Sequence, residues 1–592
     1  MNCPSRTDEV PEADGHNQNP NALSNDLTTN QDLNGIANSR VLRGGDSLSI
    51  QSAGQAVEAD RVPQSVDPHS DEKHQRITNT SAAIGQPPTG GVAAARLKKV
   101  IVTFGKFVGP GFMIAVAYID PGNYATDIAA GASYRFRLLF IVLLSNLFAI
   151  FLQSLCIKLG TVTGLNLAEA CRAFLPRWLN YVLYAMAEVA IIATDIAEVI
   201  GTAIAINLLI PKIPLVAGCA LSILDVMVIL FFYQPNGAMR GLRAFEFFVV
   251  LLVLGVVICF CIQLSMIDDT PVGDVFKGYL PSSAIVERKG LYQACGILGA
   301  TVMPHSLYLG SGIVQPRLRD YDEKKGLLPP EPRSSASSTH EDTDKAAYMP
   351  SLSAIQHSMK YSITELAISL FTFALFVNSA ILIVAGASLY QNEEAQSADI
   401  FGIHDLLSKS LSPAAGTVFA LALLLSGVSA GIVCTIAGQM VSEGALNWSL
   451  RPWLRRLVTR SISITPSIII AGAVGRTGLD AALNGSQVAL SVVLPFVTAP
   501  LIYFTCLNKY MTVLPGNARL YVPGDPEGNG LRVGIAAAVG SGGGSGATSL
   551  QGGVPGSVKM ANSIWVAVLA VIIWLIIAAM NVANLVLLGK GD

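Results

Sequence analysis

The sequence is poor in charged residues over most of its length. Only 14% of its 592 residues are Asp, Glu, Lys or Arg, whereas an ordinary soluble domain has about 25%. Hydrophobic residues make up 51% of the chain, and the mean hydropathy is +0.50. A shortage of charge that extends over several hundred residues indicates that a lipid bilayer is the solvent of this protein.

Several functional classes lack their usual signals. None of the nine cysteines forms a Cys-x-x-Cys pair, and most lie in apolar runs, so we expect neither a disulfide framework nor a zinc site. The formal net charge is −2 and there is no long basic tract, which argues against a nucleic-acid partner. Because HExxH, GxSxG and phosphate-binding loop motifs are also missing, we expect no enzyme and no cofactor.

Three segments read as flexible. Residues 1–95 are rich in Asn, Asp, Gln, Ser and Gly, cannot bury enough surface to fold, and are predicted to form a disordered cytosolic tail. Residues 317–358 carry a Pro-rich and Ser-rich stretch, and residues 508–561 contain a run of only Gly and Ser at 540–546. Both are predicted to be flexible linkers.

Apolar runs predict an all-α polytopic membrane protein. A helix needs about 20 apolar residues to cross the hydrocarbon core, and eleven runs qualify, the ninth being short. They are 107–131, 138–158, 180–209, 215–234, 244–266, 291–314, 359–389, 414–443, 460–476, 480–507 and 562–588. The first ten form the predicted transporter core within 96–507, and the segment 562–588 is predicted to be a peripheral transmembrane helix.

Basic residues set the expected orientation. Lys and Arg are more numerous in the loops on the side of the N-terminus, where we count Arg172, Arg240, Arg317 and Arg460 among others. Cytosolic loops carry such an excess, so the N-terminus is predicted to be cytosolic.

The first and sixth apolar runs are both interrupted near their centres. The first contains Asp120-Pro121-Gly122-Asn123, and the sixth contains Met303-Pro304-His305. Proline removes a backbone donor, and irregular backbone at membrane depth is tolerated only inside protein or beside a water-filled cavity. Breaks at matching places in two five-helix halves indicate an inverted-repeat transporter with its site between them. The alternative is a pair of proline kinks without a ligand.

The residues at the breaks suggest a divalent transition metal as cargo. Asp120 offers a carboxylate, Asn123 an amide oxygen, and Ala117 and Ala300 offer freed backbone carbonyls. Met303 adds a thioether, and sulfur beside oxygen favours Mn²⁺, Fe²⁺ and later transition metals over Ca²⁺ or Mg²⁺. A packing role for Met303 remains the alternative, because most buried methionines fill gaps.

The third apolar run carries three acids on one helix face. Asp195 lies seven residues after Glu188, which is a turn of about 700°, and Glu198 follows three residues later. Acids on one face of a membrane helix are costly and suit a proton relay. A structural network with Ser and Thr of neighbouring helices is the alternative.

These motifs resemble those of the Nramp family of divalent-metal transporters, particularly its fungal branch. The resemblance includes DPGN at 120–123, MPH at 303–305, TDIAE at 194–198, the motif LLLSGVSAGIVCTIAGQMVSEGAL at 423–446 in the eighth helix and SQVALSVVLPF at 486–496. It implies a LeuT-type 5+5 fold and import of Mn²⁺ or Fe²⁺ coupled to protons.

The same resemblance implies roles for individual residues. The family's metal ligands correspond to Asp120, Asn123, Met303 and the carbonyls of Ala117 and Ala300, with Gln487 joining them in some states. From its position one turn past the second break, and not from the resemblance, His305 is assigned a supporting role in the proton pathway; a core histidine with satisfied hydrogen bonds is the alternative. The family often has Asn and a second His where this chain has Ser306 and Gly310, so a proton role of that second His cannot apply here.

The expected partners are divalent metal ions, protons and the lipid bilayer, in the plasma membrane or an endosomal or vacuolar membrane. Two other functions remain open: a LeuT-fold symporter for another solute, and an Nramp-like metal sensor without transport. A measurement of metal uptake would distinguish a metal importer from both alternatives.

Overall fold

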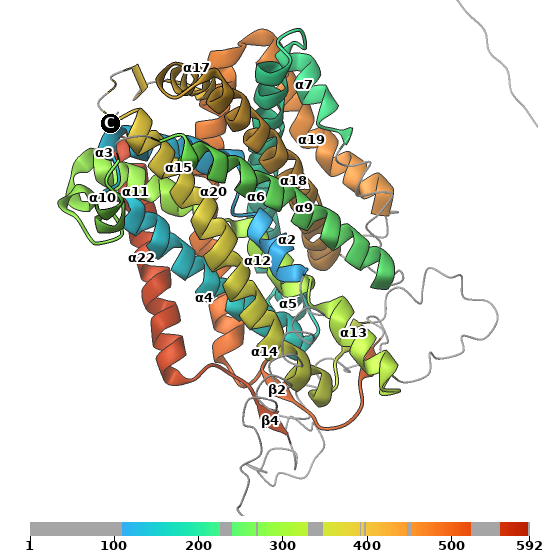
Figure 1. The fold of residues 1–592 in the computed structure, drawn as a ribbon. Helices are drawn as coiled ribbons and strands as arrows, with labels where there is room; N and C mark the ends of the chain where they lie inside the picture. Colours follow the sequence, from blue (N-terminus) through green and yellow to red (C-terminus); the bar gives the residue numbers. More distant parts are fainter. Residues whose placement is uncertain are drawn as a thin grey trace, which may run out of the picture. The chain divides into compact units, whose positions relative to one another are not determined.

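The structure of the protein is a computed structural model (Figure 1). It describes residues 109–224, 239–267, 270–328, 347–390, 392, 394–395, 398–446, 452–521 and 557–589. The predicted disordered tail at 1–95 lies outside these residues.

Long apolar helices dominate the described part of the chain, which confirms the prediction of an all-α polytopic protein. Eight helical segments are long and apolar enough to cross a membrane: Leu139–Thr163, Arg177–Leu209, Met239–Ser265, Arg288–Lys324, Leu352–Ser388, Pro413–Leu446, Arg476–Cys506 and Ile564–Val586. Of the three other predicted spans, the first is broken, the fourth continues outside the described residues, and the ninth forms a shorter apolar helix at Leu457–Ala473.

The helices that position the site are α2 Pro110–Val116, α3 Pro121–Tyr134, α4 Leu139–Thr163, α6 Arg177–Leu209, α9 Met239–Ser265, α11 Arg288–Thr301, α12 Pro304–Gly312, α13 Gln315–Lys324, α14 Leu352–Ser369, α15 Leu375–Ser388, α18 Pro413–Leu446, α19 Pro452–Ala473, α20 Arg476–Cys506 and α22 Ile564–Gly589. A π-helical turn, η3 Leu370–Ala374, joins α14 to α15. The connecting helices are α5 Leu167–Phe174, α7 Leu215–Leu221, α10 Val272–Lys277, η1 Ser283–Val286 and α17 Ile400–Ser410.

Both predicted breaks are present. The first span divides into α2 and α3 with residues 117–120 between them, and the sixth divides into α11 and α12 at residues 302–303. Each second half begins with proline, at Pro121 and Pro304, where the missing N–H costs nothing because the first turn of a helix has no partner for it. Within the bundle α6 packs against α18 and α20, α3 packs against α15, and α2 contacts α12 (Figure 1).

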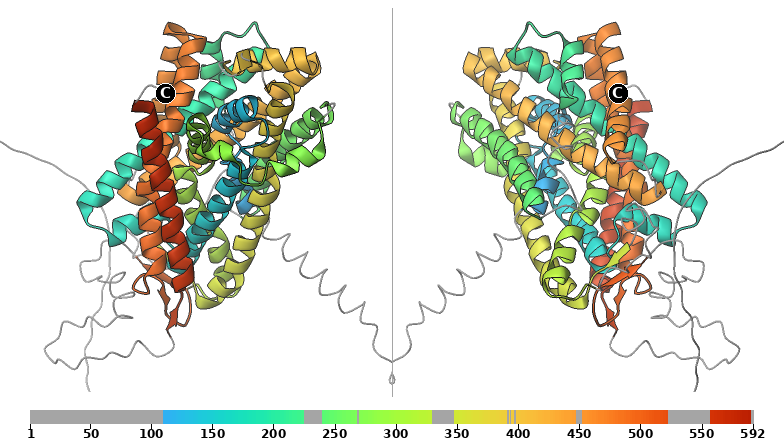
Figure 2. Two further views of the ribbon diagram at one scale, coloured as in Figure 1. Left: turned by 90° about the vertical axis from the view of Figure 1, so that its left-hand side faces the viewer. Right: turned by 90° about the vertical axis from the view of Figure 1, so that its right-hand side faces the viewer.

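The last helix lies along the outside of the bundle. Figure 2 shows α22 running beside α20, and it also contacts α11. Many of its large apolar side chains are exposed, including Trp565, Val571 and Leu575. Such a face suits contact with lipid.

The predicted loop at 317–358 is wrong at both of its ends. Residues 315–324 form α13, residues 347–349 form strand β1, and α14 begins at Leu352. A buried side chain explains why both ends of this segment have regular structure. The Asp322 carboxylate accepts hydrogen bonds from the Tyr348 hydroxyl at 2.5 Å and the Ser351 amide at 2.9 Å. The Pro-rich and Ser-rich centre of this loop lies outside the described residues.

The predicted linker at 508–561 is likewise too broad. Strand β2 Thr512–Val513 pairs antiparallel with β4 Val558–Lys559, and β1 Ala347–Met349 pairs with β3 Arg519–Tyr521. These two small sheets fix both ends of the linker, and its Gly/Ser-rich centre falls in 522–556, outside the described residues.

Candidate functional site

The two prolines determine which carbonyls are left without a helical donor. In an unbroken helix the carbonyl of residue i accepts from the N–H of residue i+4. For Ala117 that residue is Pro121, and for Ala300 it is Pro304. Neither proline has an N–H, and both alanines are buried, so each break contributes a backbone oxygen that is available to a cation.

Asp120 is held at the start of α3 by the residues that follow it. Its carboxylate accepts hydrogen bonds from the backbone amides of Gly122 and Asn123, both at 3.1 Å, and from Asn123 Nδ2 at 2.7 Å. The N-terminus of a helix favours negative charge, so this position suits a fully buried carboxylate. The orientation of this carboxylate is therefore fixed by its own helix.

Asn123 connects the first break to the sixth span. Its Nδ2 also donates to the Tyr118 carbonyl at 3.1 Å, which leaves Oδ1 to face α11. There Thr301 Oγ1 lies 3.3 Å from Asn123 Oδ1, but its single hydrogen has a shorter bond to the Ile297 carbonyl at 2.6 Å. The Asn123 amide oxygen is thus only weakly engaged and can serve as a ligand.

Gln487 of α20 lies directly against the first break. A Cβ added at Gly122 would be 2.2 Å from Gln487 Nε2, so only glycine at position 122 permits this contact. Gln487 is 6% exposed, and its Oε1 has no hydrogen-bond partner among the described residues. The structure therefore brings Asp120, Asn123 and Gln487 to one place.

Met303 marks the second break. It is fully buried and is the N-cap residue of α12, two residues after Thr301. Its carbonyl accepts a hydrogen bond from Ser306 Oγ at 2.7 Å. The contact between Thr301 and Asn123 places this break beside the first one, as the sequence predicted.

The acids of the third span have a partner that the sequence analysis missed. Arg460 of α19 forms an ion pair with Asp195, and its Nη1 also lies 3.7 Å from Glu198 Oε2. All three side chains are buried. Arg460 was assigned to a loop from its sequence position, and that assignment is wrong. Two buried acids in one helix are stabilised by a nearby cation or by protonation, and the first of these is the signal that could have pointed to Arg460.

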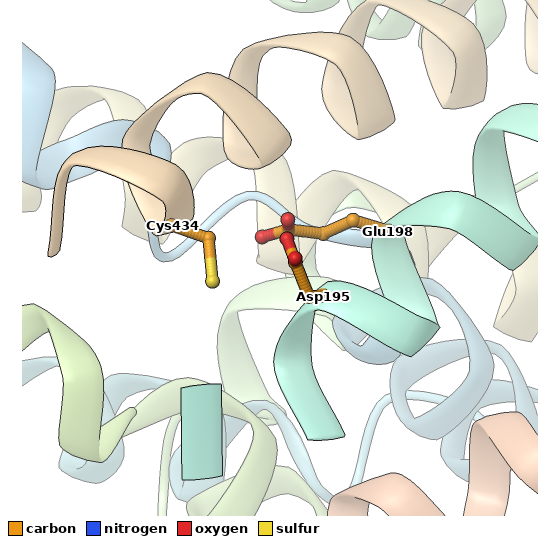
Figure 3. A group of neighbouring side chains, drawn as sticks. All are labelled: Asp195, Glu198 and Cys434. Atoms are coloured by element: carbon orange, nitrogen blue, oxygen red, sulfur yellow. The ribbon is translucent and has the colours of Figure 1, made fainter. Parts of the chain in front are cut away.

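Cys434 of α18 completes this cluster. Its sulfur and one carboxylate oxygen from each of Asp195 and Glu198 lie within 4.8 Å of one another (Figure 3). The spacing alone would suit a metal ion. However, the positively charged Arg460 guanidinium already lies beside both carboxylates and would repel a metal ion placed among them.

His305 of α12 and Glu188 of α6 occupy different surroundings. His305 is buried, and its Nδ1 lies 3.3 Å from Thr194 Oγ1, whose hydrogen is donated to the Ala190 carbonyl. The His305 Nδ1 is therefore the donor of that contact. Glu188 is half-buried and lies two turns from Asp195, about 10 Å along the helix. The structure thus brings His305 beside α6, whereas Glu188 is separated from Asp195 by two helical turns.

The free end of α2 is fastened by charged side chains from other helices. Glu365 Oε1 of α14 accepts hydrogen bonds from the amides of Gly109 at 2.8 Å and Gly111 at 3.0 Å. Next to it, Arg317 of α13 and Glu246 of α9 form a buried ion pair of 3.0 Å. These contacts therefore join α2, α9, α13 and α14 on the N-terminal side of the first break.

Comparisons with known proteins agree with this geometry. The family model described as natural resistance-associated macrophage protein-like, or Nramp, matches residues 111–522. The manganese transporter SMF1 of Saccharomyces cerevisiae is 52% identical over 503 residues, covering 84% of this chain and 87% of that protein. The iron transporter SMF3 of the same yeast is 53% identical over 429 residues, covering 72% and 87%.

A solved structure shows the same architecture. The Eremococcus coleocola manganese transporter, crystallised with an aromatic bis-isothiourea substituted compound, superposes with a TM-score of 0.61 at 28% identity. The match covers 85% of this chain and 88% of that one. The two broken spans, the family model and the extent of these similarities show that the chain belongs to the Nramp family.

Proposed function

We propose that this protein imports divalent transition metal ions, Mn²⁺ or Fe²⁺, and couples their movement to protons. The observation that carries the proposal is the junction of the two broken spans, where Asn123 is bonded to Asp120 and contacts Thr301. Gln487 lies against Gly122 at the same junction. The relatives named as manganese and iron transporters, each more than half identical, support the same cargo.

The proposed metal ligands combine hard and soft donors. Oxygen comes from a carboxylate, two amides and two backbone carbonyls, and sulfur comes from one thioether. They are Asp120, Asn123, Gln487, Ala117, Ala300 and Met303. Mn²⁺ and Fe²⁺ accept such a mixed set, whereas Ca²⁺ gains almost nothing from a neutral sulfur. Gln487 joins the set when its amide turns toward Asp120.

The proposed proton pathway follows α6. Protonation of Asp195 or Glu198 would remove the charge that holds Arg460, because a neutral acid has little attraction for a guanidinium. Proton binding would then loosen the contact between α6 and α19. Glu188 extends the row of acids along the helix. His305 contacts α6 and follows the second break, so it would couple protonation of the α6 acids to the conformation of that break.

For the orientation we propose a cytosolic N-terminus, in the plasma membrane or an endosomal or vacuolar membrane. The bias of Lys and Arg among the predicted loops supports this assignment. The end of the bundle where Glu365 fastens α2 would then face the cytosol, and metal would be released there.

Uptake into proteoliposomes tests the proposal. Vesicles carrying the purified protein, an internal metal dye and an internal pH dye are given Mn²⁺, Fe²⁺ or Ca²⁺ in separate experiments. We expect Mn²⁺ and Fe²⁺ to enter with acidification and Ca²⁺ to be excluded. Asp195→Asn and Glu198→Gln should reduce acidification more than metal entry. Normal acidification by both variants would refute the proton pathway, and absence of metal entry would refute the transport function.

A further inference from the structure

A buried polar network outside the proposed ligand set joins both breaks to α4. Gln153 of α4 donates from Nε2 to the Tyr118 hydroxyl at 3.0 Å and to Ser306 Oγ at 2.9 Å. The Tyr118 hydroxyl and Ser306 Oγ are 3.1 Å apart. Gln153 and Ser306 are fully buried, and Tyr118 lies in the unwound segment 117–120.

The number of hydrogens fixes the direction of every bond in this network. Ser306 has one hydroxyl hydrogen, and it is donated to the Met303 carbonyl at 2.7 Å. Ser306 must therefore accept from the Tyr118 hydroxyl, which in turn accepts from Gln153. The Gln153 amide supplies the two N–H groups that this arrangement needs.

Gly310 provides the space that Gln153 fills. A Cβ at position 310 would lie 2.0 Å from Gln153 Oε1 and 3.3 Å from Cys156 Cβ. Glycine inside a helix is less favourable than alanine, so its presence within α12 calls for a packing reason. The close approach of Gln153 is that reason.

The network ends on two backbone carbonyls that lie next to proposed metal ligands, those of Tyr118 and Met303. The Tyr118 carbonyl accepts Asn123 Nδ2 and Asn378 Nδ2, each at 3.1 Å, and this bond orients the Asn123 amide. At the other end, Ser306 holds the carbonyl of Met303. A change at Gln153 therefore reaches a ligand at each break.

We propose that Gln153 is a positioning residue that sets the spacing of the two breaks and thereby the discrimination between transition metals and Ca²⁺, and that Gly310 is the gap that admits it. This inference rests on the proposed metal transport. A side chain at position 310 and the present conformation of Gln153 exclude each other.

The first test replaces Gln153 by leucine, which keeps the size of the side chain and removes both donors. Gln263→Leu is the matched control, because Gln263 is equally buried, makes one bond to the Ala415 carbonyl at 3.1 Å, and lies in α9. We expect Gln153→Leu to raise the KM for Mn²⁺ about tenfold with little change in maximal rate, and to make uptake sensitive to millimolar Ca²⁺. Gln263→Leu should leave both properties unchanged.

A double-mutant cycle tests the role of Gly310. Gly310→Ala should raise the KM for Mn²⁺ when Gln153 is present and have no further effect in a Gln153→Ala background. If a variant folds poorly, the same cycle can be measured as melting temperature in detergent. The four proteins are the wild type, the two single variants and the double variant. Additive effects of the two substitutions, or equal Ca²⁺ sensitivity of Gln153→Leu and Gln263→Leu, would overturn the inference. If the wild-type protein moves no Mn²⁺, the proposed function itself fails.

Discussion

At the residue scale, two prolines account for the backbone oxygens at the proposed site. Pro121 and Pro304 remove the N–H groups that would otherwise engage the carbonyls of Ala117 and Ala300. This effect is local, because it depends only on a residue four positions later. The positions of both breaks could therefore be predicted from the sequence.

A substitution of Met303 tests the selectivity that we assign to its sulfur. Met303→Ala should retain some Mn²⁺ transport, lose much of its Cd²⁺ transport and become sensitive to Ca²⁺, because a hard ion gains little from a thioether. A tenfold loss of discrimination corresponds to about 1.4 kcal/mol. The measurement is Mn²⁺ uptake titrated with millimolar Ca²⁺, and Met511→Ala, which removes an equally buried sulfur outside the site, is the control. Equal inhibition of wild type and Met303→Ala would show that Met303 only fills space.

Partners that are distant in the sequence were not predictable. Arg460 lies 265 residues from Asp195, and its position at the start of a predicted span made it look like a loop charge. Thr301 and Gln153 are ordinary polar residues in apolar runs, and only the packing of α4, α11 and α12 shows which atoms they contact. Local sequence therefore predicts the break residues, whereas the residues that orient them emerge from tertiary structure.

At the scale of elements, the last helix is attached where α20 carries an internal proline. Pro495 has no N–H, so the carbonyl of Ser491 lacks its helical donor, and Asn581 Nδ2 of α22 donates to it instead. One turn further along, Trp574 Nε1 donates to the Pro495 carbonyl at 2.8 Å. The sequence predicted a peripheral helix, but this attachment depends on two helices about 90 residues apart.

This attachment predicts a compensating pair of substitutions. Asn581→Leu should lower the free energy of unfolding by about 1–3 kcal/mol, because it leaves a buried carbonyl unsatisfied. In a Pro495→Ala background, where residue 495 regains an N–H for Ser491, the same substitution should have little effect. Thermal unfolding of the four proteins in detergent measures the difference. The attachment would be disproved by an equal loss in both backgrounds.

Contacts between distant parts of the chain also explain the regular structure at the edges of the predicted linkers. Helix α13 is polar and short, so composition favours a loop there, yet Arg317 pairs with Glu246 from another helix and becomes buried. Asp322 in the same helix binds Tyr348 and Ser351 across the loop. Neither contact has a local sequence signal.

At the scale of the whole transporter, the structure has its proposed site closed from solvent. Asp120, Asn123 and Met303 are each 0% exposed. On one side the closure includes α2, which Glu365 fastens through the amides of Gly109 and Gly111. Under the proposed function, release of a metal ion on that side would require these bonds to open.

The role of Glu365 can be tested by chemical accessibility. A cysteine introduced at Val116, which is buried in α2, should react slowly with a water-soluble maleimide in the wild-type background and several-fold faster with Glu365→Ala. Glu323→Ala removes an exposed acid of α13 and serves as the control. Unchanged labelling in the Glu365→Ala protein would mean that this carboxylate does not hold α2 closed.

The most direct test of metal binding at the breaks is Mn²⁺ uptake by Asp120→Asn compared with Asp127→Asn. Both acids are fully buried in α3 or at its N-cap, but only Asp120 belongs to the proposed ligand set. We expect Asp120→Asn to fold and to lose Mn²⁺ uptake, because it removes the one formal negative charge from the proposed ligands. Asp127→Asn should retain uptake. Wild-type uptake by Asp120→Asn would contradict the account.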